Sequence, residues 1–203
     1  MSKQMEEKKD STKDSTIESM ESSPWGSFVY HITAYAGKEI GNIVFEGKTL
    51  EEISEKYAND PKGKALWIKG AMERLDALVD EETRYGIMRY CGAACAGACA
   101  RGGIDKAIEM RKKFDTIDEF LKANGFDGEV FHVNYSPHRD GKRCHCLGND
   151  LPVEEIMSPT YCQCSVGHVK TFWEEVLERP VKVDLIHSAI TGADECKFAV
   201  RLA

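Results

Sequence analysis

The pattern of hydrophobic and polar residues has a helical period in the first half of the chain. Between residues 49 and 123, apolar positions recur every three to four residues and predict helices over 49–59, 62–80, 82–100 and 115–124. Thr49 and Glu52 have the spacing of a capping box at the start of the first helix. The Arg-Gly-Gly sequence at 101–103 is expected to end the third helix.

After residue 125 the period changes from 3.6 to two. This alternation predicts strands over 130–135, 142–147, 181–190 and 196–202. A helix is expected to begin near Ser165 and to end before Pro180. The C-terminal half is therefore predicted to be a β-β-α-β-β unit, with two hairpins forming an antiparallel sheet. Helices followed by strands indicate the α+β class.

The chain has 203 residues and a mass of 22.7 kDa, enough for one domain with a core. Residues 1–23 contain few large apolar side chains and are expected to form a disordered tail. Residues 24–203 are expected to form a single α+β domain. The sequence leaves the oligomeric state open.

Charge and hydropathy exclude several classes of protein. The formal net charge of −7 argues against a dedicated nucleic-acid-binding protein. No apolar run approaches the roughly 20 residues that span a bilayer, so no membrane partner is expected. The N-terminus lacks the apolar centre of a secretory signal, which predicts a cytoplasmic location.

The cysteines are the most informative feature of the sequence. In a reducing compartment, clustered cysteines indicate a metal site or a reactive thiol more often than a disulfide. Seven of the eight cysteines fall into three groups, namely C-x3-C-x3-C, CHC and CQC. These seven candidate metal ligands are Cys91, Cys95, Cys99, Cys144, Cys146, Cys162 and Cys164.

Helix geometry limits how these thiols could bind a metal. The first three cysteines share one helix face, but the outer two lie about 12 Å apart along the axis, too far for one zinc ion. One adjacent pair could bind zinc together with thiols from CHC or CQC. Zinc is the expected metal and an iron–sulfur cluster is the second candidate. Alternatively, the stripe of Cys, Ala and Gly allows this helix to pack closely against a neighbour.

A second functional interpretation is nucleophilic catalysis. Cys162 and Cys164 are predicted to lie at a helix N-terminus, where the helix dipole lowers the pKa of a thiol. His168 lies one turn after Cys164 and could act as its base.

The last forty or so residues resemble two families. The ending consists of a helix, a strand, a Gly-Asp-type turn at 192–194 and a strand carrying Cys196-Lys-Phe198. It resembles the 4-vinyl reductase-type small-molecule-binding domain and the L-2-amino-thiazoline-4-carboxylic acid hydrolase family. His187 stands where such domains often have a cysteine, and Ala193 separates Gly192 from Asp194. The resemblance implies a ligand-binding domain whose cysteines line or cap a site.

These observations give one leading hypothesis and two alternatives. The leading hypothesis is a protein that holds a metal centre with its cysteines and binds a small-molecule ligand. The first alternative is a thiol-dependent hydrolase of the L-2-amino-thiazoline-4-carboxylate type. The second is a non-catalytic binding domain with buried free thiols.

Overall fold

The computed structural model of the protein describes residues 24–135, 151–152 and 154–203. In chain order, its helices and strands are α3 (Pro24–Ala36), α4 (Lys38–Val44), α5 (Leu50–Lys56), α6 (Pro61–Leu78), α7 (Glu81–Cys99), α8 (Arg101–Arg111), α9 (Ile117–Ala123), β1 (Val130–Tyr135), α10 (Pro159–Leu177), β2 (Val181–His187), the short 3-10 helix η4 (Ala189–Thr191) and β3 (Cys196–Leu202). Helices precede an antiparallel sheet, so the predicted α+β class is confirmed.

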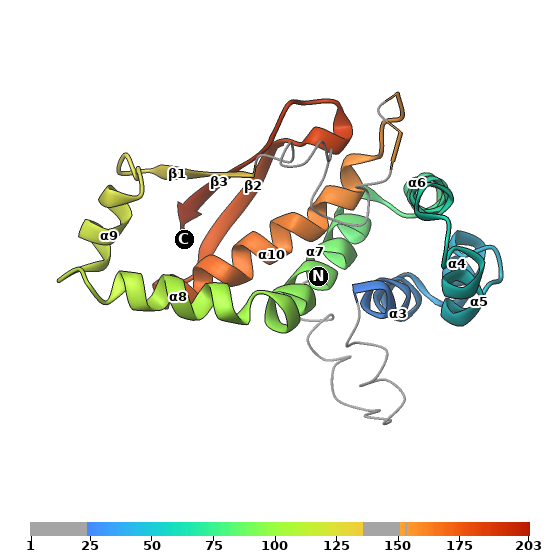
Figure 1. The fold of residues 1–203 in the computed structure, drawn as a ribbon, viewed down its shortest axis with the longest axis horizontal. Helices are drawn as coiled ribbons and strands as arrows, with labels where there is room; N and C mark the ends of the chain where they lie inside the picture. The colour runs from blue at the N-terminus through green and yellow to red at the C-terminus, as the bar shows by residue number, and fades with distance from the viewer. Residues whose placement is uncertain (1–23, 136–150, 153) are drawn as a thin grey trace.

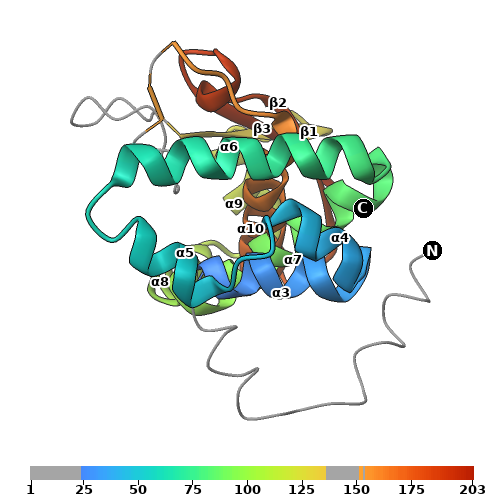
Figure 2. The same ribbon diagram turned by 90° about the vertical axis from the view of Figure 1, so that its right-hand side faces the viewer.

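Two long helices, α7 and α10, form the centre of the fold. In Figure 1, helices α3–α6 lie on the right, while α8, α9 and the strands lie on the left. Figure 2 shows the sheet above α10, with α7 and α3 below it. Arg84 of α7 is hydrogen-bonded to Thr160 of α10, and Arg89 is hydrogen-bonded to Gln163. Residue numbers therefore increase in the same direction along both helices, which run parallel.

Side-chain caps stabilise the starts of several predicted helices. The Thr49 side chain accepts a hydrogen bond from the Glu52 amide, and the Glu52 side chain accepts one from the Thr49 amide, which completes the capping box. Asp60 and Asp80 cap α6 and α7 with single hydrogen bonds, which their side chains accept from the amides of Gly63 and Thr83. Thr116 caps α9, one residue after the Asp115 that the pattern suggested.

The buried apolar residues form two clusters that meet along α10. The first cluster packs α3–α7 against the start of α10 and includes Ile32, Ile68 and Met72. The second packs α8, α9 and the end of α10 against the sheet and includes Phe131 and Phe198. Because α10 contributes to both clusters, it is buried along much of its surface.

The strand order is β1-β3-β2, with both neighbours antiparallel to β3. Phe131, Val200 and Val183 are paired across the sheet and are buried against the helices. The opposite face carries exposed polar side chains such as His132 and Asp184. One buried face and one polar face are usual for an antiparallel sheet.

The structure differs from the predicted elements in four places. Helices α3 and α4 were not predicted. The third predicted helix ends at Cys99, as expected, but the residues at 101–103 begin a further helix, α8, that was not predicted. Helix α10 begins at Pro159, six residues earlier than expected. Strand β2 ends at His187, and 189–191 form a 3-10 turn.

Several predictions lie outside the described residues, namely the tail at 1–23 and the strand at 142–147 with its Cys144 and Cys146. The hairpin of β2 and β3 is confirmed. No helix in the described ranges is long and apolar enough to cross a membrane.

Candidate functional site

Two glycines let α7 and α10 approach each other very closely. A Cβ atom on Gly92 would lie 1.8 Å from the carbonyl oxygen of Cys164 and 2.8 Å from the amide nitrogen of His168. A Cβ atom on Gly167 would lie 2.0 Å from the carbonyl oxygen of Arg89. The two backbones therefore touch at positions that only glycine can occupy without displacing a helix. This contact agrees with the close-packing interpretation of the Cys, Ala and Gly stripe.

The close contact brings the Arg89 side chain next to α10. Its Nε donates a hydrogen bond of 3.0 Å to Oε1 of Gln163, a side chain that is 5% exposed. The guanidinium also lies over the ring of Tyr85, 5.9 Å from its centroid. A buried amide acceptor and an aromatic ring thus fix the orientation of an exposed positive charge.

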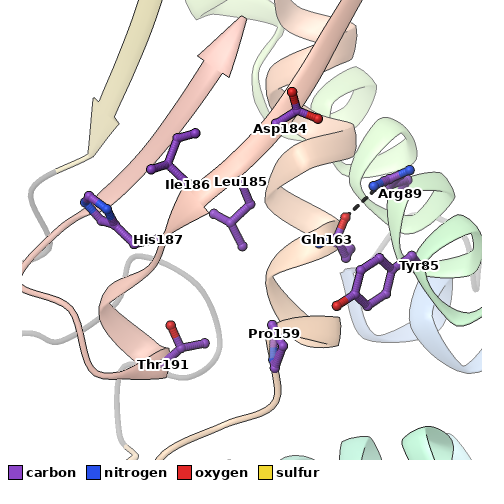
Figure 3. A pocket seen from close by; sticks show the side chains of 9 residues that line it. All are labelled: Tyr85, Arg89, Pro159, Gln163, Asp184, Leu185, Ile186, His187 and Thr191. Atoms are coloured by element: carbon purple, nitrogen blue, oxygen red, sulfur yellow. Dashed lines mark hydrogen bonds between the residues drawn. The ribbon is translucent and has the colours of Figure 1, made fainter. Parts of the chain in front are cut away.

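Arg89 lies at the edge of a pocket between α7, α10 and β2 (Figure 3). The pocket has a volume of about 340 Å³. Its lining residues are Tyr85, Arg89, Pro159, Gln163, Asp184, Leu185, Ile186, His187 and Thr191. On one side of the pocket, α7 and α10 contribute the polar side chains of Tyr85, Arg89 and Gln163. The other side is formed mainly by four consecutive residues of β2, 184–187.

The other two ionisable side chains of the pocket, Asp184 and His187, have neighbours of their own. The carboxylate of Asp184 forms an ion pair with Arg201 of β3. Nε2 of His187 lies 3.7 Å from Oε1 of Glu195. Among the described residues, Arg89 forms no ion pair. Its positive charge is therefore the uncompensated one in the pocket.

Tyr85 and Thr191 add hydroxyl groups to the pocket. Burial, with a contribution from the Glu81 carboxylate, raises the pKa of Tyr85, so its phenol stays protonated at neutral pH. Thr191 donates a 2.9 Å hydrogen bond to the carbonyl oxygen of Ser188. Its Oγ1 also lies 3.1 Å from Oγ of Ser188, which connects the pocket wall to a buried serine.

A partly buried polar network holds the N-terminal end of α10 in place. Thr160 is fully buried, and its hydroxyl donates to Asp76 at 2.6 Å while accepting from Nε of Arg84 at 3.1 Å. The Arg84 guanidinium also pairs with Asp76 at 2.9 Å and donates to the carbonyl oxygen of Val79. This network joins α6, α7 and α10 beside the pocket.

The cysteines of α7 have different surroundings. Cys91 is buried, and its thiol lies 3.8 Å from the carbonyl oxygen of Ser27 in α3. Burial raises the pKa of Cys91 to about 12, so at neutral pH this thiol is protonated. Cys95 is half-buried and Cys99 is exposed near the end of the helix.

The cysteines of α10 lie inside the helix and not before it. Because α10 begins at Pro159, the predicted placement of Cys162 and Cys164 ahead of a helix start near Ser165 is wrong. Cys162 is 6% exposed, and its thiol donates to Oγ of Ser188 at 3.1 Å. Cys164 is half-buried against the first core cluster.

His168 follows Cys164 by one turn, as the spacing predicted. Burial lowers its pKa. Cys196 of β3 lies in another place, where its sulfur accepts a hydrogen bond of 3.4 Å from the amide of Ala189. The hydrolase pairing of Cys162 or Cys164 with His168 stays a prediction.

The predicted metal centre also stays a prediction. Within 24–135, 151–152 and 154–203, no three His, Cys, Asp or Glu side chains are close enough to hold a metal ion. Cys91, Cys162 and Cys164 border the same core cluster, but the first contacts α3 and the second contacts Ser188. Cys144 and Cys146 lie outside the described residues.

Comparisons with known proteins assign the chain to a family. The family described as "Family of unknown function (DUF6144)" matches residues 28–202, which is most of the chain. The protein belongs to the DUF6144 family. No curated protein and no solved structure matched this DUF6144 protein.

Sequence reasoning missed the residues that form the pocket. Arg89 and Gln163 are 74 positions apart, and nothing local connects them. The sequence did contain one signal for the contact between these helices, namely Gly92 and Gly167. A glycine inside a helix often has a packing reason.

Proposed function

We propose that this DUF6144 protein binds a small-molecule ligand that carries a negatively charged group. The ligand occupies the pocket between α7, α10 and β2. The observation that carries the proposal is the guanidinium of Arg89, which Gln163 fixes at the pocket and which has no acidic partner among the described residues.

The charge balance of the pocket favours an anion. Asp184 forms an ion pair with Arg201, and His187 lies beside Glu195, whereas no described acidic side chain pairs with Arg89. One of its five N–H donors is bonded to Gln163, so four remain. A carboxylate or phosphate accepts two parallel hydrogen bonds from such a planar group.

The rest of the pocket suits an organic ligand. Leu185, Ile186 and Pro159 offer apolar surface, and Tyr85 and Thr191 offer hydroxyl groups. A volume of about 340 Å³ lies at the lower end of the range found for ligand pockets, roughly 300–1,000 Å³. The implied ligand is a small organic acid with an apolar part.

The test compares two arginine variants. Thermal stability is measured with a panel of organic carboxylates and phosphates, and calorimetry then gives the Kd of each anion that stabilises the protein. Hydrogen bonds to charged groups contribute about 1.5–3 kcal/mol, so Arg89→Gln should weaken binding by roughly 10- to 150-fold. Arg89→Lys keeps the positive charge but loses the planar guanidinium. Its Kd should therefore lie between those of the wild type and Arg89→Gln.

Arg179→Gln is the matched control. Arg179 also forms no ion pair among the described residues, but it does not line the pocket. It removes the same charge from the protein, so binding should stay within about twofold of the wild type. Equal loss in both variants, or no anion that binds the wild type, would show that Arg89 is not an anion site.

A further inference from the structure

Strand β2 is an edge strand, and the pocket runs along its free edge. In the described sheet, β2 pairs with β3 on one side only. Successive side chains of a strand point to opposite faces, so a pocket against one face would be lined by alternate residues. Here the four consecutive residues 184–187 line the pocket. The pocket therefore faces the edge, where a strand presents unpaired backbone N–H and C=O groups.

An irregularity in β2 lies within the same stretch. The register with β3 shifts between Leu185 and His187, which leaves Ile186 without a paired residue in β3. The side chain of Ile186 is 50% exposed. A bulge of this kind often lies next to a binding site, because it redirects side chains and interrupts strand pairing.

We propose that the ligand of this pocket is a short peptide with a free C-terminal carboxylate, bound in extended conformation along the edge of β2. The inference rests on the proposed function, because the carboxylate is the anion that Arg89 binds. The peptide backbone forms hydrogen bonds with the edge of β2 and becomes an added strand. An anion without amide groups would leave this edge unused.

The dimensions fit a ligand of this size. At about 3.3 Å per residue, the four lining residues of β2 extend over about 13 Å, which matches a peptide of three to four residues. The half-buried Leu185 and the exposed Ile186 are suited to apolar, β-branched side chains on the peptide. Asp184 is paired with Arg201, so it does not oppose the carboxylate as an isolated charge.

The test uses calorimetry with N-acetyl-Val-Val-Val and four modified forms. The first has a C-terminal amide in place of the carboxylate and should bind at least tenfold more weakly. The other three carry an N-methyl group on one of the three amides in turn. An edge strand forms backbone hydrogen bonds with every second residue of the strand beside it. Of two neighbouring amides, N-methylation of one should therefore weaken binding at least tenfold, and N-methylation of the other less than threefold.

The outcomes separate the peptide from the simpler anion. If isovalerate binds as tightly as the tripeptide, or if all three N-methylated peptides bind equally well, the peptide inference is wrong and the anion site stands. If neither isovalerate nor the tripeptide binds, the peptide inference and its carboxylate site both fail.

A second copy of the chain is the other candidate for this edge. Sedimentation velocity would then show a dimer that Ile186→Lys converts to monomer, since a lysine on an edge strand blocks pairing with a second copy. That result would overturn the peptide inference.

Discussion

The contact of Gly92 with α10 allows a quantitative prediction. In Gly92→Ala, the new methyl group would lie 1.8 Å from the carbonyl oxygen of Cys164. A carbon atom approaches a carbonyl oxygen no closer than about 3.3 Å even in a weak C–H···O contact. The carbonyl oxygen of Cys164 and the nearby amide nitrogen of His168 both belong to the backbone, so no change of rotamer can relieve the clash. The two helices must move apart by about 1.5 Å, the difference between these distances.

The cost follows from the loss of packing. A gap of 0.5–1 Å already forfeits about a quarter to a half of the attraction between contacting atoms. Overpacking a core costs about 1–3 kcal/mol and occasionally more. The higher helix propensity of alanine offsets about 1 kcal/mol of this loss in stability. Since the contact joins the two central helices, we expect the overpacking cost to lie at the upper end of this range, so the free energy of unfolding should fall by about 2 kcal/mol.

Urea denaturation followed by circular dichroism measures this change. With an m-value of about 2 kcal/mol/M, the urea midpoint should fall by about 1 M. Gly97→Ala is the matched control in the same helix, because nothing lies within 4 Å of a Cβ at that position. It should leave the midpoint unchanged or raise it. If Gly92→Ala unfolds at the same urea concentration as Gly97→Ala, the close approach of α7 and α10 is wrong.

Four further predictions test the surroundings of the site. Thr160→Val should lower the free energy of unfolding by about 1–3 kcal/mol in urea titrations, while Thr160→Ser restores most of it, because the hydroxyl bonds both Asp76 and Arg84. Mass spectrometry after iodoacetamide treatment at pH 7.5 should find Cys99 labelled and Cys91 unlabelled until urea is added; equal labelling would contradict their burial. Burial lowers the pKa of His168, so the unfolded state binds a proton first and stability should fall as the pH drops below about 6.5. Urea midpoints at pH 7.5 and 5.5 should show a smaller fall in His168→Gln, and parallel falls would refute this role. If the cysteines hold a metal centre, protein purified without chelator should contain about one equivalent of zinc or iron, and less than about half would count against it.

The sequence determined the elements whose signals are local. The capping box at Thr49 and Glu52, the apolar period of α6 and the alternation in β1 and β3 depend on residues close in the chain. For this reason the α+β class and the hairpin of β2 and β3 could be predicted. The start of α10 could not, because residues 160–163 are buried on every side and show no apolar period.

The tertiary structure alone decided the candidate site. Two glycines let α7 and α10 approach so closely that Arg89 and Gln163 meet, and the energy of that contact depends on residues about 75 positions apart. The direction of each thiol was likewise fixed by its neighbours, with Cys91 facing α3 and Cys162 facing Ser188. A residue pattern records which side chains are present, whereas their environment depends on how the helices and strands pack together.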